Sequence, residues 1–261
     1  MSEPRFAFGR NWQRLVARLE GGAIDSARAK LVEMLGTGDL GGRRMLDIGS
    51  GSGLMSLAAR QLGAQVTSFD YDADSVGCTR EVRQRYRPDD VDWTVAQGSA
   101  LDEAYMAKLG TFDLVYAWGV LHHTGAMWRA MELAAAAVAP GGTFYVALYN
   151  DQGWISRYWL WIKRNWVRRP WTRPLAILVH APYFIGLRWL VWVLRGRGGL
   201  ARGMDLWIDL IDWLGGYPFE VASRDSVRIW AGTKGFDLST EASAGRRHGC
   251  NEFVLRRKAA P

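Results

Sequence analysis

The chain has 261 residues, of which 49% are hydrophobic and 23% charged, enough for one α/β domain with an insertion and its own apolar core. Its two cysteines, Cys78 and Cys250, lie far apart in the sequence and show no metal-ligand spacing, so we expect a reducing compartment and no disulfide framework. The opening MSEPRFAFGRNWQRL has no apolar run of signal-peptide length. We therefore expect a cytoplasmic location.

The net charge of +7 is concentrated in one segment. Between Trp154 and Arg202 there are ten Lys or Arg residues, no Asp or Glu, and seven of the fourteen tryptophans. The rest of the chain is slightly acidic, with 23 basic and 26 acidic residues. The sequence thus predicts two regions with different tasks.

The elements predicted along the first part of the chain alternate between helix and strand. An amphipathic helix is expected from about Trp12 to Leu35, ended by the GTGDLGG loop. Turns rich in Gly or Asp follow, and AlaProGlyGly at 139–142 closes the last helix of this part. This order is typical of an open parallel sheet covered on both faces. The predicted strands are 43–48, 64–70, 91–97, 112–118 and 143–149, and the helices between them are 54–62, 73–86 and 126–138.

The alternation stops after Asn150 for about seventy residues. It resumes with a helix at 223–235 and strands at 236–242 and 252–257. We predict an α/β, Rossmann-like domain from 40–150 and 221–261, preceded by an N-terminal helical lid at 1–39. Residues 151–220 are then a Trp- and Arg-rich helical insertion between strands five and six.

A glycine-rich turn, LDIGSGSG, follows the first predicted strand and holds Asp47, Gly49, Gly51 and Gly53. Glycines allow positive φ and let a ligand approach the backbone. Leu54 stands where a dinucleotide fingerprint has its third glycine, which disfavours a pyrophosphate. Asp70 ends the second strand, where a carboxylate can accept the hydroxyls of a ribose. S-adenosylmethionine (SAM) therefore fits this turn better than NAD does. The alternative is that the turn binds no cofactor and contains ordinary turn glycines and a capping Asp.

DIGSGSG, SFDYD, FDLVYAW and APGG together resemble the class I SAM-dependent methyltransferases over roughly residues 40–150. With WGVLHH, the pattern is similar to bacterial ubiquinone-type O-methyltransferases. The resemblance implies a seven-stranded Rossmann-like sheet, with helices on both faces and the last strand antiparallel. It also implies that the glycines line the methionine and ribose and that Asp70 binds the ribose hydroxyls, and the expected cofactor residues are completed by Asp47, Tyr71 and Trp118.

The sequence differs from the family pattern at the end of the third strand. Many members have an Asp directly after the glycine there, to hold the adenine amine, whereas this chain has QGSALD. We expect Ser99 or the backbone around Ala100 to substitute for it. Asp102 is the nearest acid.

Two adjacent histidines, His122 and His123, follow the fourth strand in AWGVLHHTG. A neutral histidine can accept the acceptor's proton at cellular pH, and such a base contributes about 10² to 10⁴ in rate. We expect His123 rather than His122 to be this base. The alternatives are that both rings are structural or that the site aligns the reactants without a base.

The acceptor is expected to contact Tyr149 and Asn150, after the fifth strand, together with the N-terminal residues Phe8, Asn11 and Trp12. The N-terminal segment then acts as a lid, or alternatively packs onto the sheet as an ordinary helix. No compact set of metal ligands is found in the sequence, so no metal is expected.

The insertion mixes tryptophans with Arg and Lys in WISRYWLWIKRNWVRRPWTRP. The twenty residues after it are interrupted by His180, Pro182 and Arg188, which disfavours a membrane-spanning helix. Aromatic and basic side chains favour the surface of an anionic membrane, peripherally at the inner face. A soluble lid over the pocket and a nucleic-acid clamp remain alternatives.

These observations predict SAM-dependent methyl transfer to an oxygen, or less favourably a nitrogen, of a hydrophobic small-molecule or lipid-linked acceptor. One alternative is an RNA-modifying methyltransferase that uses the basic insertion to hold its substrate. Another is a cofactor-binding protein without catalysis. The sequence leaves the acceptor and the oligomeric state open.

Overall fold

The fold is given by a computed structural model that describes residues 6, 9–187, 206–245 and 249–259. A seven-stranded sheet has the order β3-β2-β1-β4-β5-β7-β6, and β7 runs antiparallel to both of its neighbours. The predicted Rossmann-like sheet, with its antiparallel last strand, is therefore confirmed. The strands are β1 Arg44–Ile48, β2 Gln65–Asp70, β3 Trp93–Gln97, β4 Phe112–Trp118, β5 Val138–Tyr149, β6 Phe236–Ala242 and β7 Cys250–Arg257.

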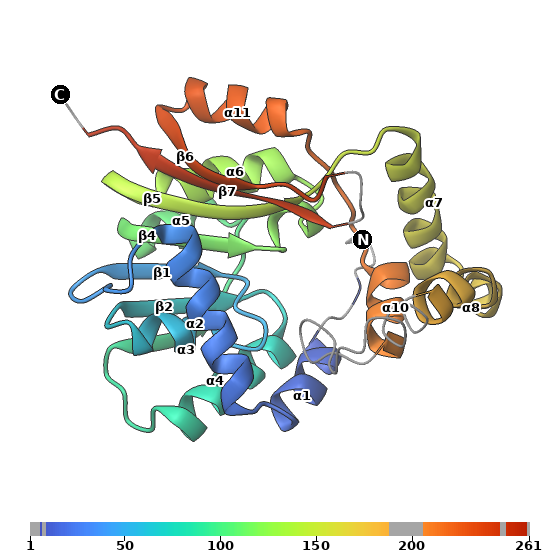
Figure 1. The fold of residues 1–261 in the computed structure, drawn as a ribbon, viewed down its shortest axis with the longest axis horizontal. Coiled ribbons are helices and arrows are strands. Elements are labelled where there is room, and N and C mark those ends of the chain that lie inside the picture. The colour runs from blue at the N-terminus through green and yellow to red at the C-terminus, as the bar shows by residue number, and fades with distance from the viewer. Residues whose placement is uncertain (1–5, 7–8, 188–205, 246–248, 260–261) are drawn as a thin grey trace.

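Helices cover both faces of the sheet because alternate strand residues point to opposite sides (Figure 1). Leu46 of β1 packs with one set of helices, and its neighbour Met45 packs with the other set. The first set is α5 Glu103–Leu109, α6 Met127–Ala136 and α11 Arg224–Thr233. The second is α1 Gly9–Ala17, α2 Gly21–Leu35, α3 Leu54–Gln61 and α4 Ala73–Tyr86.

Two local predictions were wrong, and one helix was missed. The single helix from Trp12 to Leu35 is two helices, α1 and α2, because Glu20 is extended (φ −113°, ψ 162°) just before two glycines that weaken a helix. Helix α5 was not predicted, since it has seven residues and too few turns for a clear apolar period. Strand β5 already begins at Val138, and its pairing with β4 is irregular near Phe112.

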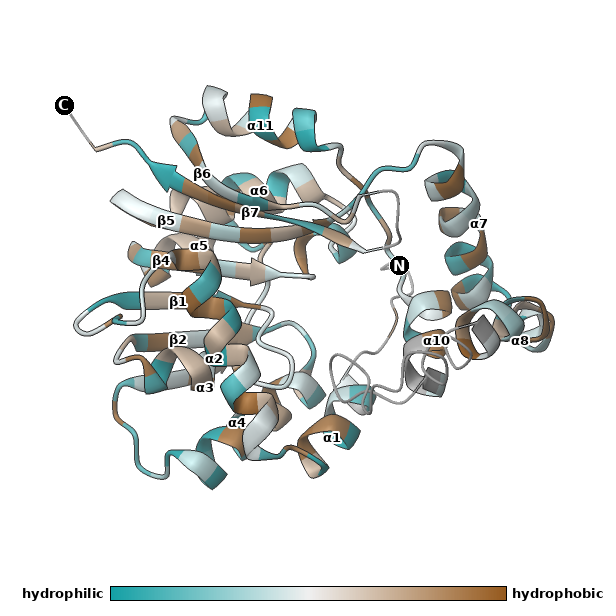
Figure 2. Cartoon of the chain, in the orientation of Figure 1, coloured by the Kyte–Doolittle hydropathy of each residue, from teal (hydrophilic) through white to brown (hydrophobic). Residues whose placement is uncertain are grey.

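Residues 154–187 and 206–215, between β5 and α11, form a helical lobe beyond the carboxyl ends of β1 and β4 (Figure 1). Its elements are α7 Trp154–Arg168, a short turn Pro170–Thr172, α8 Arg173–Ala181, a π-helical turn Pro182–Leu187 and α10 Leu206–Gly215. Helix α7 carries both hydrophobic and hydrophilic residues (Figure 2). It buries Trp159, Ile162 and Trp166 in an apolar cluster of the lobe. Among the described residues, no helix is long and apolar enough to cross a bilayer.

Candidate active site

The glycine turn connects β1 to α3 and lies at the switch point of the sheet, where strand order reverses between β1 and β4. Gly49 and Gly51 have φ values of +72° and +54°, which non-glycine residues rarely adopt. A methyl group added at Gly51 would lie 3.0 Å from the Trp12 ring, and one at Gly49 would collide with Val120. The turn therefore leaves no room for a Cβ atom, because Trp12 and Val120 pack closely against its backbone.

Asp70 stands at the end of β2 and is held by two backbone amides. The Gly51 amide donates to Oδ2 at 3.0 Å, and the Asp72 amide donates to Oδ1 at 2.9 Å. Burial raises the pKa of Asp70, and these amide hydrogen bonds oppose the shift. The carboxylate is thus fixed beside the glycine turn, with lone pairs left for further donors. Tyr71, the next residue, is 60% exposed.

Asp47 lies inside the sheet rather than at its surface. The Ser56 hydroxyl of α3 donates to Asp47 Oδ2 at 2.5 Å, and Ser56 is in turn 2.7 Å from Ser68 Oγ. Burial raises the pKa of Asp47 to about 7. These contacts hold α3 against β1 and β2, while a contact between Asp47 and a cofactor stays a prediction.

The residues expected near an adenine lie between β3 and α5. The Leu101 amide donates to Ser99 Oγ at 3.2 Å, and Ala100 is buried. Asp102 is the N-cap of α5, since its Oδ1 accepts the Tyr105 amide at 3.0 Å. The nearest acid therefore has a structural partner of its own, so that any adenine contact depends on Ser99 and the backbone.

The two histidines form a short turn, Leu121–His123, directly after β4. His122 is fully buried, and its Nδ1 accepts the Tyr149 amide at 3.4 Å. His123 is half-buried, and its Nδ1 lies 2.6 Å from the Pro218 carbonyl. Because a carbonyl oxygen only accepts, Nδ1 of His123 carries the proton, and its Nε2 keeps the lone pair.

Neither histidine is charged at cellular pH. Burial lowers the pKa of His122 well below its ordinary value of 6.5, with His123 and Lys163 adding to the shift. Burial likewise lowers the pKa of His123 to about 3, the Pro218 hydrogen bond opposing the shift and Lys163 adding to it. Both rings are therefore neutral, so that each can donate and accept hydrogen bonds, and both are weak bases.

Sequence reasoning missed Lys163, which lies within the apolar cluster of the lobe and is fully buried. Its Nζ donates to the Trp213 carbonyl and lies 4.5 Å from the centre of the Trp213 ring and 5.0 Å from that of Phe219. Burial lowers the pKa of Lys163 to about 7, and Asp212 opposes the shift. The signal was present, because Lys163 falls on the apolar stripe of α7 between Ile162 and Trp166.

The N-terminal residues connect the glycine turn to the helical lobe. Trp12 packs on Gly51, and the Asn11 amide donates to Asp212 of α10. The Gly9 amide donates to Asp72 Oδ2 at 2.9 Å, which ties α1 to α4. The structure thus places Asn11 and Trp12 at the candidate site, whereas Phe8 lies outside the described residues.

The remaining predicted residues separate into two groups. Tyr149 is at the centre of the aromatic contacts, with ring centres 3.9 Å from His122 and 5.5 Å from Trp213. Trp118 is half-buried and packs on the apolar cluster of the α1–α4 face. Asn150 points elsewhere, because its amide donates to Gly245 O at 2.9 Å and its oxygen accepts from Asn251 at 3.0 Å. Among the described residues, no group of three metal-ligating side chains is found.

Comparison with known proteins identifies the family of the chain. A family model described as a methyltransferase domain matches residues 9–195. Ubiquinone biosynthesis O-methyltransferases from Methylobacterium sp. (strain 4-46) and Bordetella avium (strain 197N) are 33% and 31% identical over 44% and 49% of this chain. These matches cover 45% and 51% of the two relatives, so the chain spans about half the length of the curated relatives it matches.

A solved structure, magnesium protoporphyrin IX methyltransferase from Synechocystis PCC 6803 with bound SAH, aligns with a TM-score of 0.58. The alignment covers 95% of this chain and 94% of that chain at 15% identity, which is a likeness of fold. The chain belongs to the methyltransferase-domain family and is a class I SAM-dependent methyltransferase. Its cofactor is therefore SAM.

The residues of the glycine turn fit this cofactor. A turn without Cβ atoms would let the methionine part approach its backbone, and the Asp70 carboxylate beside it would accept the hydroxyls of a ribose. When bound, SAM supplies an electrophilic methyl group. What this chain adds is a fixed carboxylate, a covered turn and two neutral imidazoles at one edge of the sheet.

Proposed function

We propose that this enzyme methylates an oxygen of a hydrophobic small molecule whose reactive hydroxyl lies between His123 and the glycine turn. The observation that carries the proposal is the His123–Pro218 hydrogen bond, because it fixes the ring directly after β4 and, by placing the proton on Nδ1, makes Nε2 the basic nitrogen. Tyr149, whose ring centre lies 5.4 Å from that of His123, and Phe219, which packs on Tyr149, favour an apolar ring. O-methyltransferases among the sequence relatives support oxygen as the methylated atom.

His123 then acts as a hydrogen-bond acceptor that takes the proton late. With its pKa lowered to about 3, the ring does not ionise a phenol beforehand. A hydroxyl becomes far more acidic as its oxygen gains the methyl group, so proton transfer accompanies methyl transfer. Residues 1–39 serve in this proposal as a lid, since Asn11 and Trp12 join the lobe to the glycine turn.

The test is methylation of a panel of phenols and prenylated catechols with radiolabelled SAM, comparing wild type with His123→Ala and His180→Gln. His180 is a matched control because it is an imidazole of the lobe, bound to Ala176 O and near Tyr158. We expect His123→Ala to lower kcat about 10²-fold with SAM binding retained. Unchanged turnover of the His123 variant would contradict the role of His123 as the base. Absence of labelled methyl ether with every phenol would contradict the proposed class of acceptor.

We further propose that the lobe contacts an anionic membrane surface, from which a lipid-linked acceptor reaches the site. Helices α7 and α8 and the turn between them expose large side chains that the lobe's own cluster does not use, with Trp154 71%, Trp171 75% and Leu178 72% exposed. The charged residues from 154 to 187 are all basic. Tryptophan and exposed arginine together favour the interface of an anionic bilayer.

Vesicle co-sedimentation separates this proposal from a soluble lid or an RNA clamp. Phosphatidylglycerol vesicles are expected to retain the wild type more than phosphatidylcholine vesicles do, and a Trp154→Ala/Trp171→Ala/Leu178→Ala variant is expected to remain in solution. A matched control, Ile229→Ala, removes an apolar side chain that is 69% exposed on α11. Equal retention of all three proteins contradicts membrane contact, as does binding to single-stranded RNA without vesicle binding.

A further inference from the structure

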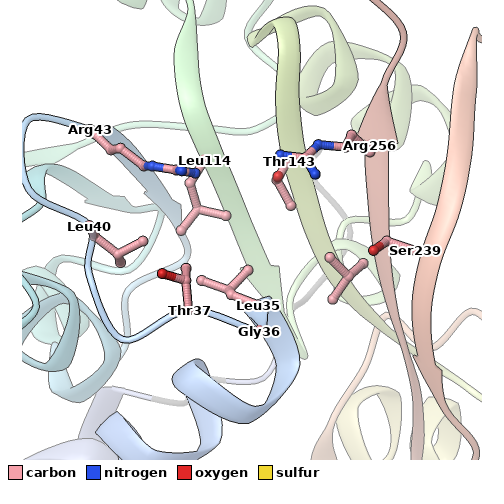
Figure 3. Close-up of a pocket in the computed structure, with 10 residues that line it drawn as sticks. Leu35, Gly36, Thr37, Leu40, Arg43, Leu114, Thr143, Ser239 and Arg256 are labelled. Carbon is pink, nitrogen blue, oxygen red and sulfur yellow. The ribbon is translucent and has the colours of Figure 1, made fainter.

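A cavity of about 230 Å³ lies at the amino edge of the sheet (Figure 3). It is lined by the end of α2, the loop before β1, and strands β4 to β7. The candidate active site is at the other edge, because the glycine turn follows the carboxyl end of β1. Six residues of extended chain from Arg43 to Gly49 separate the two by about 20 Å. The cavity is therefore a separate place on the molecule.

Two arginines face each other across this cavity. Arg43 comes from the loop before β1 and Arg256 from β7, and Figure 3 shows their side chains extending toward one another from opposite walls. Within the described part of the chain, neither guanidinium has a carboxylate within ion-pair distance, and no acidic residue lines the cavity. Two positive charges on opposite walls of one cavity repel each other, so an anion between them would stabilise the arrangement.

Hydroxyl groups complete the lining. Thr143 of β5 and Ser239 of β6 contribute side chains, and Thr37 lies at the loop after α2. Ser239 stands where the pairing of β6 with β7 shifts register between Leu238 and Thr240. Such bulges redirect a side chain, and they occur next to binding sites more often than elsewhere. The cavity thus offers hydrogen-bond donors around its two charges.

The rest of the lining is apolar, with Leu40, Leu114 and Val254. One feature opposes an anion, because the carbonyl end of α2 at Leu35 carries partial negative charge. That end corresponds to about half a negative elementary charge, whereas the two guanidinium groups carry two full positive charges. The Gly36 amide also caps the Val32 carbonyl and reduces the effect.

We propose that this cavity is a second ligand site that takes a small phosphate-bearing molecule with a short apolar body. The phosphate lies between Arg43 and Arg256, where guanidinium groups match its oxygens in pairs, and Thr143 and Ser239 donate to it. The apolar part rests on Leu40, Leu114 and Val254. A volume of about 230 Å³ suits a molecule of the size of phenyl phosphate. The proposal does not depend on the identity of the methyl acceptor.

Isothermal titration of the full chain with phenyl phosphate, inorganic pyrophosphate and phenol tests the site. We expect saturable binding of phenyl phosphate and no binding of phenol. Arg43→Gln and Arg256→Gln are each expected to weaken the binding of phenyl phosphate about tenfold, since one charge-assisted contact is lost. Arg80→Gln, which removes an exposed arginine from α4, should bind as the wild type does. SAM binding and thermal unfolding report whether each variant is folded.

The outcomes are distinct because both arginines are exposed and their substitution leaves the core intact. No saturable binding of phenyl phosphate overturns the proposal. The proposal is also overturned if Arg43→Gln and Arg256→Gln bind phenyl phosphate as tightly as the wild type does, because the ligand then lies elsewhere. Pyrophosphate binding as tightly as phenyl phosphate would support the anion site but overturn the apolar contacts with Leu114 and its neighbours.

Discussion

At the scale of single residues, burial sets the charge of the groups around the candidate active site. It lowers the pKa of His123 to about 3 and that of Lys163 to about 7, and it raises the pKa of Asp47 to about 7. Each pKa unit corresponds to about 1.4 kcal/mol between the charged and neutral forms. The carboxyl edge of the sheet is therefore less highly charged at neutral pH than its sequence indicates.

Asp70→Asn is expected to weaken SAM binding about 10- to 100-fold, measured by isothermal titration. The amide keeps one acceptor oxygen but loses the charge that favours ribose hydroxyls and the Gly51 amide. Asp237→Asn is the control, because Asp237 pairs with Lys258 at the surface of the last strands. Equal affinity of both variants for SAM would contradict the role proposed for Asp70.

Lys163→Met is expected to stabilise the protein more at pH 6 than at pH 10. The pKa of Lys163 is about 7 when folded and 10.5 as the ordinary value, so the folded state binds fewer protons between these limits. The free energy of unfolding of the wild type therefore rises as pH increases from 7 to 10.5, and the full penalty of the buried charge is present below 7. Methionine removes this dependence.

Urea unfolding at pH 6, 8 and 10 measures the difference between wild type and Lys163→Met. Lys258→Met serves as the control, because the Lys258 side chain is 60% exposed. If the difference between wild type and Lys163→Met does not change with pH, Lys163 is protonated when buried, held by Trp213 and Asp212.

At the scale of elements, α1 joins parts of the molecule that the sheet does not hold together. It packs on α4 through Gly9, covers Gly51 with Trp12 and reaches α10 through Asn11. Nine residues make a helix too short to be stable alone, so its position depends on these contacts. Loss of one contact should free α1 while the sheet stays folded.

Asn11→Ala is expected to speed release of S-adenosylhomocysteine about tenfold, because the hydrogen bond to Asp212 holds the lid against the lobe. Stopped-flow fluorescence with excess SAM as competitor measures the rate. Gln13→Ala, on the exposed side of α1, should release the ligand as the wild type does. A release rate that Asn11→Ala leaves unaltered would show that α1 does not limit exit.

At the scale of the whole molecule, the described residues form three apolar clusters. Two of them lie on the faces of the sheet, and the third, around Trp159 and Leu210, belongs to the helical lobe. Tyr149 and Val221 connect the third cluster to the sheet. Because the lobe buries fewer apolar side chains than the sheet does, its local opening should need less free energy.

Hydrogen exchange is expected to show this order. Amides of α7 and α8 should exchange faster than those of β1, β4 and β5 under native conditions. Added SAM should protect the glycine turn and α1, since ligand binding stabilises the elements it contacts. Exchange of α8 at the same rate as β4 would mean that lobe and sheet open as one unit.

Local sequence determined the strands of the sheet and the place of the glycine turn. Alternating apolar periods and LDIGSGSG predicted the strands, the glycine turn and the position of Asp70, because these depend on neighbours along the chain. The break at Glu20 and the helix α5 were missed, as their signals extend over a few residues. The domain boundaries and the roles of the predicted site residues stay predictions.

Tertiary structure alone decided which distant residues meet and what their surroundings do to them. Lys163 reaches Trp213 across fifty residues, and Arg43 faces Arg256 across the whole domain. A pKa depends on how much water is excluded by side chains from several elements. The sequence therefore indicates an ordinary base strength for His123, whereas burial in the fold makes His123 a weak base. Such long-range packing is not contained in the local periodicity of the sequence.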